Sequence, residues 1–352
     1  MKILIAGDWH SDLHEETMFR ALIALEQQAL RFAWHIYFDK NSRNYLSLIY
    51  ARFQRKYMLG CTVDKINHDL IEKIEEEQPD ILFIYRGTHI YQKTLQIIKK
   101  TNTRIKIFGY NNDDPFSTKY PKWQWRHFVK SIPEYDVLFA YRKHNLPELD
   151  AAGAKKSALL RSWFDPLRSY PVTLNQSEIQ EYGCDVVFIG HYEDDERLDY
   201  LREIIRNGYK LKIWGPGYDW NPIIKKIPEF KHFPPIRLAW GEEYNKALCA
   251  SKIALCFHSK LNRDTYTRRN FEIPASGTFM LSSYSEDLAS LFAEGKEADY
   301  FTTKDELISK LNKYLSNDEL RTNIAKMGRE KVYSAKHDVK SRMQEILEFA
   351  TS

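Results

Sequence analysis

The sequence predicts an α/β protein with two domains, each built around a parallel sheet. Short apolar runs alternate with helical patterns in both halves of the chain, which is typical of βαβ units. The length of 352 residues exceeds the size at which one hydrophobic core usually keeps growing. An irregular stretch with prolines and polar residues, 163–182, separates the two patterns, and we interpret it as the linker.

Five strands are predicted in the first half, at Lys2–Ala6, Ile36–Phe38, Asp80–Tyr85, Ile105–Gly109 and Asp136–Tyr141. A helix is predicted after the first of them, from about Glu15 to Ala29. Polar residues follow three of the strands directly, at Asp8 and His10, at 86–89 and at 111–114. Because the strands of a parallel sheet point their loops at one edge, where ligands bind, these loops predict a site.

The second half restarts the same rhythm, with strands predicted at Asp185–Ile189, Lys210–Trp214, Ile253–Phe257 and Thr278–Ser282. Gly190 follows the first of these strands and allows the backbone to approach a ligand closely. The tail from Thr303 is predicted to be helical, because Thr303 and Glu306 have the spacing of a capping box and an apolar face follows them.

The composition argues against several classes of protein. A formal net charge of +4 is too small for the basic stripe of a nucleic-acid-binding protein, although it would suit an anionic nucleotide sugar or a membrane surface. The four cysteines have no C-x-x-C spacing, and Cys184, Cys249 and Cys256 lie in or beside apolar runs, which predicts buried free thiols. No apolar run approaches 18 residues and no signal peptide precedes the first strand, so we expect a cytoplasmic protein with at most peripheral membrane contact.

The stretch from Tyr266 to Leu281 contains the most informative pair of residues. Arg269 and Glu272 are three positions apart and can lie on one face of a short helix, ahead of Gly277 and a buried strand. The arginine can bind an anion, and the carboxylate can accept hydrogen bonds from sugar or ribose hydroxyls. The alternative is a solvated surface ion pair, which is the usual meaning of such a pair.

The segment "RRNFEIPASGTFMLSS", followed by "LFAEGKEADYF" and the helical tail, resembles the CgeB-like glycosyltransferase family. The similarity reaches "NNDDPF" at 111–116 and "DVVFIGHYEDDER" at 185–197, and so covers most of the chain. The resemblance implies the GT-B architecture, in which two Rossmann-like domains face a central cleft. It also implies an acceptor domain at 1–168, a nucleotide-sugar (donor) domain at 169–335 and a helix at 336–352 that returns to the N-terminal domain.

The same resemblance implies a donor site that requires no metal ion. Cationic and N–H groups must then neutralise the departing diphosphate. The expected donor-binding residues are Gly190, His191, Arg197, Gly215, Tyr244, Arg263, Asp264, Arg268, Arg269 and Glu272.

These residues have different expected roles. Arg197 and Arg269 are predicted to hold the diphosphate. The candidates for binding the nucleotide base are the loop at Gly215 and the segment 234–244. Glu272 matches the ribose-binding glutamate of the Glu-x7-Glu motif found in retaining GT-B families. The first position of that motif is Asp264 here, and this departure puts the role of residue 264 in doubt.

Two mechanisms stay open for the transfer step. An inverting enzyme needs a general base near the acceptor hydroxyl, whereas a retaining enzyme of this fold can use the leaving phosphate itself. The candidates for the base are Asp114 and His10, followed by Asp113 and Asp8. Each aspartate could equally cap a turn or helix, and a lone histidine in a loop is more often structural.

The sequence therefore predicts a glycosyltransferase that moves a sugar from a UDP-, GDP- or dTDP-sugar to a carbohydrate or lipid-linked acceptor, in the assembly of surface polysaccharide or glycoconjugate. No further cofactor is expected. The alternative is a catalytically silent protein of the same fold that binds nucleotide sugar or glycan in a coat or assembly complex. An epimerase or phosphorylase of similar fold is a third hypothesis, and a phosphorylase would need a pyridoxal lysine site, for which there is no signal.

Overall fold

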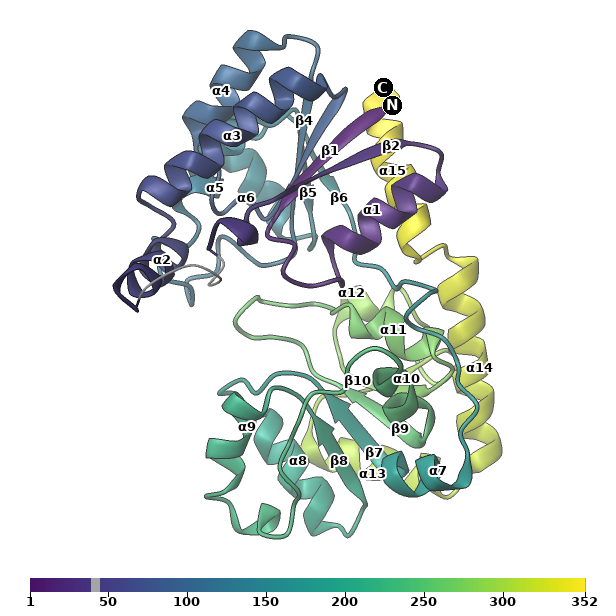
Figure 1. The fold of residues 1–352 in the computed structure, drawn as a ribbon. Coiled ribbons are helices and arrows are strands. Elements are labelled where there is room, and N and C mark those ends of the chain that lie inside the picture. Colours follow the sequence, from purple (N-terminus) through teal and green to yellow (C-terminus); the bar gives the residue numbers. More distant parts are fainter. Residues whose placement is uncertain (39–44, 352) are drawn as a thin grey trace. The chain divides into compact units, whose positions relative to one another are not determined.

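The computed structural model describes residues 1–38 and 45–351, and these divide into two compact units (Figure 1). The N-terminal unit comprises residues 1–162 and the C-terminal segment from Val339, and the C-terminal unit comprises Trp163–Asp338. The predicted boundaries, after residues 168 and 335, differ from these bounds by six and three residues. The first difference arises because Phe164 is fully buried in the C-terminal unit, where its N–H donates to the carbonyl of His337.

The N-terminal unit is built around a six-stranded parallel sheet. In the order of the sheet, the strands are β2 (Gln28–Ala33), β1 (Lys2–Gly7), β3 (Ile81–Tyr85), β4 (Lys106–Asn111), β5 (Val137–Ala140) and β6 (Ser157–Leu159). Every residue of β3 and β5 is buried, as expected of central parallel strands that are covered on both faces.

Helices cover both faces of this sheet (Figure 1). The helices α1 (Glu15–Ala24) and α15 (Val339–Thr351) lie side by side on one face, and α3 (Cys61–Glu77), α4 (Gln92–Thr101) and α5 (Arg126–Ser131) lie on the other. The remaining helices are α2 (Tyr45–Tyr57), α6 (Asn145–Ala151), η1 (His35–Phe38) and η2 (Ile132–Glu134). Leu4, Leu70 and Ile98 are fully buried in the core between the sheet and the second group.

One strand prediction in this unit is wrong. Residues 36–38 belong to the 3-10 helix η1, and the second strand is β2, at Gln28–Ala33. The preceding helix accordingly ends at Ala24 rather than at the predicted Ala29. Because β2 is an edge strand, exposed and buried residues are mixed along it, and such a pattern resembles the end of an amphipathic helix.

The C-terminal unit is built around a five-stranded parallel sheet. In order, its strands are β11 (Asp299–Phe301), β10 (Phe279–Ser283), β9 (Ser251–Cys256), β7 (Cys184–Ile189) and β8 (Leu211–Trp214). The four strands predicted for this half are confirmed to within two residues, and β11 was not predicted.

Helices also cover both faces of the second sheet (Figure 1). One face carries α8 (Arg197–Arg206), α9 (Gly217–Ile224) and α13 (Lys304–Leu315), and the other carries α10 (Glu242–Cys249), α11 (Arg269–Ala275) and α14 (Asp318–Ser334). The short elements α7 (Gln176–Tyr182), η3 (Pro228–Phe230) and α12 (Glu286–Ala289) lie in the connections. None of the helices in the described ranges combines the length and apolar composition that crossing a bilayer requires.

The last helix of the chain packs in the N-terminal unit, as the resemblance implied. Helix α15 contacts α1, and Phe349 packs edge-on against Phe139 of β5 with ring centroids 5.2 Å apart. Just before this helix, Asp338 forms a parallel bridge with Phe164 in the C-terminal unit. The two segments that pass from one unit to the other therefore begin side by side.

Each sheet has one point at which the chain reverses the direction in which it adds strands. In the N-terminal unit, β2 and β3 flank β1, and in the C-terminal unit, β8 and β9 flank β7. Open parallel sheets bind ligands beyond the carboxyl ends of the strands at such a switch point. The loops after β1, β3, β7 and β9 are therefore the places to look for a site.

Thr303 caps the N-terminus of α13, as predicted, and its contribution to stability can be measured. Its Oγ1 accepts a hydrogen bond from the Glu306 N–H at 3.1 Å, whereas the Glu306 carboxylate accepts from the N–H and hydroxyl of Thr302 rather than from Thr303. Thr303→Ala removes the capping acceptor and is expected to lower the free energy of unfolding by about 1 kcal/mol. Urea denaturation measures this loss. Thr303→Ser keeps the hydroxyl and should unfold like the wild type, and equal loss in both variants would contradict the capping role.

Candidate functional site

The loop after β1 carries a hydrogen-bonded pair of candidate catalytic residues. His10 Nδ1 lies 2.9 Å from Asp8 Oδ2, and an Arg55 guanidinium nitrogen lies 3.2 Å from the same oxygen. The His10 side chain is 55% exposed and the Asp8 side chain 19%. The histidine can therefore meet a ligand while the aspartate holds it from behind. Arg55 comes from α2, and no motif in the sequence pointed to it.

The two members of this pair shift each other's protonation. Burial alone would raise the pKa of Asp8, but the hydrogen bond from His10 and the charge of Arg55 lower that pKa to about 2. The hydrogen bond to Asp8 raises the pKa of His10 above its ordinary value of 6.5. Asp8 is thus an anion at neutral pH, and His10 can take up a proton that Asp8 stabilises.

Strained backbone marks three of the loops at the switch points. Trp9, Arg86 and Arg263 follow β1, β3 and β9, and their φ angles of 54°, 65° and 49° lie in the left-handed region. A residue other than glycine held in this region costs on the order of 1–3 kcal/mol, and such strain gathers at ligand sites. The strain therefore falls where the topology alone predicts binding.

Arg86 also brings a second candidate, Asp113, to this edge of the N-terminal sheet. A guanidinium nitrogen of Arg86 lies 2.5 Å from Asp113 Oδ2, and the guanidinium carbon lies 5.4 Å from the centre of the Trp125 ring. The ion pair joins the loop after β3 to the loop after β4. Asp113 is therefore engaged by a cation and is less suited than His10 to take a proton.

Asp114 is fully buried, which argues against its predicted role as the base. Its carboxylate accepts hydrogen bonds from the Phe116 N–H at 3.0 Å and from the Asn145 amide at 2.9 Å, and His144 Nε2 lies 3.4 Å away. These bonds tie the loop after β4 to α6. The sequence also allowed the two aspartates before the proline to stabilise a turn. That role explains the surroundings of Asp114 better than proton transfer does.

In the C-terminal unit, two glycines allow the loops after β7 and β8 to meet. A Cβ on Gly215 would lie 2.2 Å from the carbonyl oxygen of Gly190, and Trp220 Nε1 donates a hydrogen bond to the same oxygen at 2.8 Å. A larger residue at 215 would push these loops apart. Both glycines were predicted to lie near a ligand. The structure adds that the residue at 215 must be small, because a side chain there would collide with the Gly190 carbonyl.

Arg269 lies against Gly190 from the other side. A Cβ on Gly190 would lie 3.4 Å from both the guanidinium carbon and one terminal nitrogen of Arg269. Within the described residues, the buried Nε of this arginine has no hydrogen-bond partner. Two observations therefore point to an anion at this place, namely a cation held at a glycine turn and a donor without an acceptor.

His258 follows β9 and is a neighbour of Arg269. It was not among the residues predicted to bind the donor. Burial and the charge of Arg269 lower the pKa of His258 to about 4, so its imidazole is neutral at pH 7. Its Nε2 lies 3.5 Å from the hydroxyl of Ser282 in β10. A polar residue just beyond a strand at the switch point was the signal that could have identified it.

Glu272 is buried and held from two sides. Its Oε1 forms an ion pair with Arg268 Nε at 2.8 Å, and its Oε2 accepts a hydrogen bond from the Tyr244 hydroxyl at 2.9 Å. Burial and the Glu272 charge raise the pKa of Tyr244 well above its ordinary value, so this hydroxyl stays a donor. Glu272 is therefore no solvated surface residue, and Arg268 is its ion-pair partner in place of Arg269.

Arg197 does not offer a guanidinium to a ligand in this structure. Its side chain is 2% exposed and forms a two-point pair with Asp195, at 2.8 Å on each side. A third bond goes to the carbonyl of His191 at 2.9 Å, and Glu193 lies 3.2 Å away. Arg197 thus stabilises the acidic loop between β7 and α8, and Arg269 is the better candidate for the diphosphate.

The other predicted donor residues lie in two different surroundings. His191 is largely exposed and its Nδ1 lies 2.9 Å from Asp219 Oδ2 in α9. Asp264 closes a turn, since its N–H donates to the carbonyl of Ser259 and its carboxylate accepts from the Ser259 N–H at 3.3 Å. Arg263 is exposed in the same loop.

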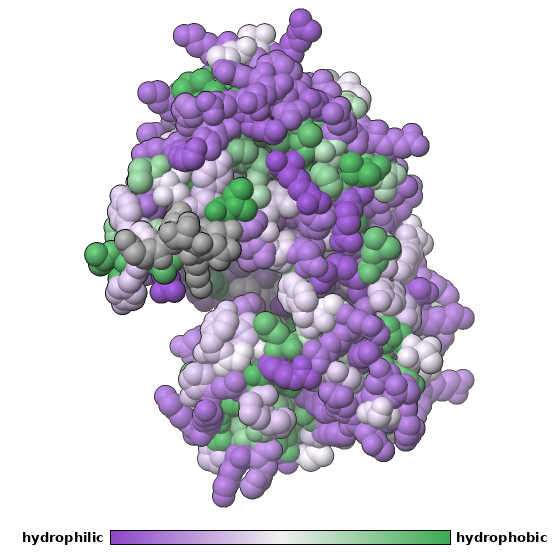
Figure 2. Space-filling view, in the orientation of Figure 1, coloured by the Kyte–Doolittle hydropathy of each residue, from purple (hydrophilic) through white to green (hydrophobic). Residues whose placement is uncertain are grey.

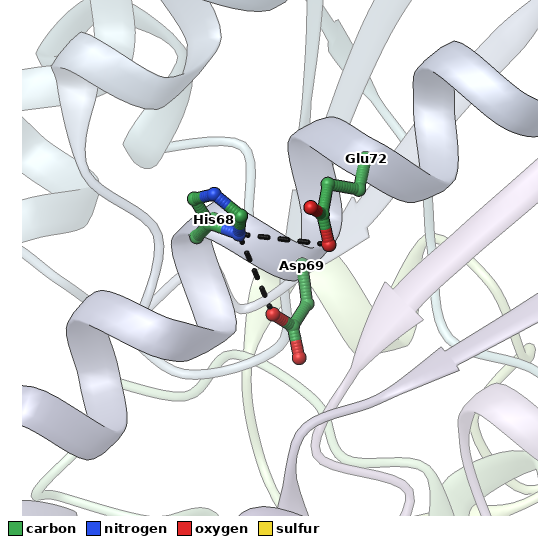
Figure 3. A group of neighbouring side chains, drawn as sticks. All are labelled: His68, Asp69 and Glu72. Atoms are coloured by element: carbon green, nitrogen blue, oxygen red, sulfur yellow. Dashed lines mark ion pairs between the residues drawn. The ribbon is translucent and has the colours of Figure 1, made fainter.

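Two groups of side chains in the described residues bring three possible metal ligands within 4.8 Å of one another. One is Asp114, His144 and Glu148. The other lies on the surface of α3, where His68 Nδ1 is 3.7 Å from Asp69 and 3.6 Å from Glu72 (Figure 3). Lys65 and Tyr37 already donate hydrogen bonds to Asp69. Exposed groups of this kind are common without a metal, and neither group includes a predicted donor-binding residue.

Removing the Arg197 side chain tests whether it stabilises the loop. Arg197→Ala leaves the nearly buried Asp195 without its cation, and we expect a loss of about 3 kcal/mol in the free energy of unfolding without any ligand. Arg206→Ala in the same helix removes a half-exposed pair and should cost less than about 1 kcal/mol. Chemical denaturation measures both. Equal stability of the two variants would show that Arg197 is not needed for folding.

Two comparisons relate this geometry to known proteins. Residues 197–348 match the family model described as "Glycosyl transferase-like". The matched segment includes Tyr244, Arg269 and Glu272. No curated protein matches the chain in sequence.

Solved structures match almost the whole chain. HepE from Anabaena, in complex with UDP and glucose, has a TM-score of 0.71 at 12% identity, over 100% of this chain and 99% of its own. Sucrose-phosphate synthase from Thermosynechococcus elongatus has a TM-score of 0.72 at 11% identity, over 100% of both chains. Trehalose 6-phosphate synthase from Burkholderia multivorans has a TM-score of 0.65 at 11% identity, over 99% and 98%. The likeness to these structures identifies the fold of the chain as GT-B, and the family match relates residues 197–348 to glycosyl transferases.

Proposed function

We propose that this protein transfers a sugar from a nucleotide-diphosphate donor to a carbohydrate or lipid-linked acceptor during the assembly of a surface polysaccharide or glycoconjugate. The observation that carries the proposal is the pairing of Arg269 at Gly190 with a fixed carboxylate, Glu272, one helical turn along α11. A cation suits the diphosphate of the donor, and a carboxylate suits its hydroxyls.

Arg269 is the proposed diphosphate ligand. During transfer, the bond between the sugar and the diphosphate breaks, and negative charge grows on the phosphate oxygens. A guanidinium that is already in place stabilises that charge in the transition state more than in the ground state, and such a difference accelerates the reaction. The neutral imidazole of His258 lies next to it as a further polar group.

Glu272 is proposed to accept hydrogen bonds from the ribose of the donor. Arg268 and Tyr244 hold the carboxylate in one orientation, so little side-chain freedom is lost when a ligand binds. The crystal structure of HepE with UDP-glucose, which has the same fold, supports a uridine nucleotide as the first donor to test.

His10 is the proposed general base if the reaction proceeds with inversion. In that case its neutral imidazole takes the proton of the acceptor hydroxyl, and the Asp8 carboxylate stabilises the imidazolium that forms. In a retaining reaction, a departing phosphate oxygen takes this proton, and the pair would contact the acceptor only.

The direct test is release of nucleoside diphosphate. The purified protein is incubated with UDP-, GDP- and dTDP-sugars, with and without EDTA, and free nucleoside diphosphate is measured over time. Release from one donor supports the transferase, and release that survives EDTA supports neutralisation by guanidinium groups. Binding of a donor in a thermal-shift assay without any release of nucleoside diphosphate would favour the silent protein. Conversion of the donor's sugar that does not depend on an acceptor would favour an epimerase.

Arg269→Ala is expected to lower kcat/KM on the order of 10²-fold, or about 2.7 kcal/mol, because the departing diphosphate loses its cation. Arg104→Ala, which removes an exposed arginine between α4 and β4, is the matched control and should leave kcat/KM unchanged. Steady-state kinetics with the best donor measure both. A folded Arg269→Ala protein with the kinetics of the wild type would refute the assignment.

Asp8→Asn is expected to shift the pH dependence of an inverting reaction. The base must be neutral, so kcat/KM rises with pH through the pKa of His10, which Asp8 holds above 6.5. Without the carboxylate this pKa falls, and the rising limb of the profile moves to lower pH while the maximum rate drops. Asp64→Asn removes an exposed carboxylate on α3 and should leave the profile in place. An unshifted profile in Asp8→Asn would exclude His10 as the base.

A further inference from the structure

The outward face of α2 exposes an unusual amount of apolar surface. Tyr45 and Leu46 are 77% and 75% exposed, and Ile49, Tyr50 and Phe53 are each about half exposed. The five positions are spaced so that they form one continuous stripe along the helix. Figure 2 shows hydrophobic residues at the left-hand edge, where Figure 1 places α2.

Packing on the opposite side of α2 fixes which face points outward. Ala51 and Gln54 are buried. The Gln54 side-chain oxygen accepts a hydrogen bond from the Thr62 N–H at 2.8 Å, which attaches α2 to the first turn of α3. The apolar stripe is therefore a defined surface of a packed helix.

The charged residues of α2 itself all have one sign. Residues 45–57 include three cations, Arg52, Arg55 and Lys56, and no aspartate or glutamate. Arg55 pairs with Asp8, whereas Arg52 and Lys56 are exposed beside the stripe. Trp123 packs against Tyr57 at 5.0 Å between ring centres, which brings the exposed Lys122 to the same end of the helix.

We propose that α2 docks the protein on an anionic phospholipid bilayer, with its apolar stripe in the headgroup region and Arg52 and Lys56 among the lipid phosphates. Amphipathic helices with aromatic and aliphatic residues on one face and cations beside them bind such surfaces. The excess of cations favours a lipid surface over a second copy of this chain, because two such faces would repel each other.

The docking surface also bears on the acceptor. Arg55 of the docking helix contacts Asp8, so the Asp8–His10 pair lies next to α2 within the N-terminal unit. Provided that the proposed function holds, this position favours a lipid-linked acceptor over a free sugar. Membrane docking itself does not depend on catalysis and can be measured without it.

Vesicle sedimentation of the full-length protein tests the docking. The wild type should sediment with vesicles of phosphatidylcholine and phosphatidylglycerol, and much less with vesicles of phosphatidylcholine alone or in high salt. Leu46→Ser with Ile49→Ser, and separately Arg52→Gln with Lys56→Gln, should each weaken binding on the order of tenfold.

A matched control distinguishes binding through this surface from non-specific binding of exposed apolar residues to vesicles. Ile179 in α7 is 46% exposed, as Ile49 is, and Ile23 in α1 is 50% exposed. Ile23→Ser with Ile179→Ser should therefore bind vesicles like the wild type. The proposal is overturned if the wild type does not bind anionic vesicles, if the α2 variants bind as well as the control, or if light scattering shows a dimer that only the α2 variants break. Donor hydrolysis by the α2 variants should stay at the wild-type rate, so loss of docking is distinguishable from loss of catalysis.

Discussion

The C-terminal site depends on the close approach of two loops at positions without a side chain. Gly190 and Gly215 end neighbouring strands, and the carbonyl of Gly190 accepts the Trp220 indole N–H in the space that a Cβ on Gly215 would fill. On its other side, the guanidinium of Arg269 lies 3.4 Å from the place that a Cβ on Gly190 would occupy. Glu272 has Arg268, and not Arg269, as its ion-pair partner. The proposed donor site thus depends on backbone of these two loops that can pack at van der Waals distance.

In the N-terminal unit, ion pairs rather than glycines hold the loops at the strand ends in place. Its loops carry residues in strained conformations, Trp9 and Arg86, and ion pairs hold those loops in place. The pair of Asp8 and His10 is exposed on one side and supported by Arg55 on the other. Such a support raises the basicity of the imidazole without burying it, which is what a group that exchanges protons with a ligand requires.

Much of this architecture could be predicted because strand patterns and strand-end residues are local signals. The parallel sheets, the cap at Thr303 and the return of the last helix were all expected. The role of Arg197 was not, because its partner Asp195 competes with any ligand only once the loop is folded. The burial of Asp114 could not be predicted for a similar reason, since Asn145, which donates a hydrogen bond to it, is 31 residues away in the sequence. The stripe on α2 could not be predicted either, because the exposure of a helix face depends on what the helix packs against.

The position of α15 has a consequence for how the chain is synthesised. Phe349 packs against Phe139, and α15 packs on α1, so the first unit to leave the ribosome lacks one of its own helices until residues 339–351 have been synthesised. The C-terminal unit, which is continuous in sequence, can fold before its predecessor is complete. A nascent chain stalled before residue 339 would then leave the face of α1 that packs against α15 uncovered.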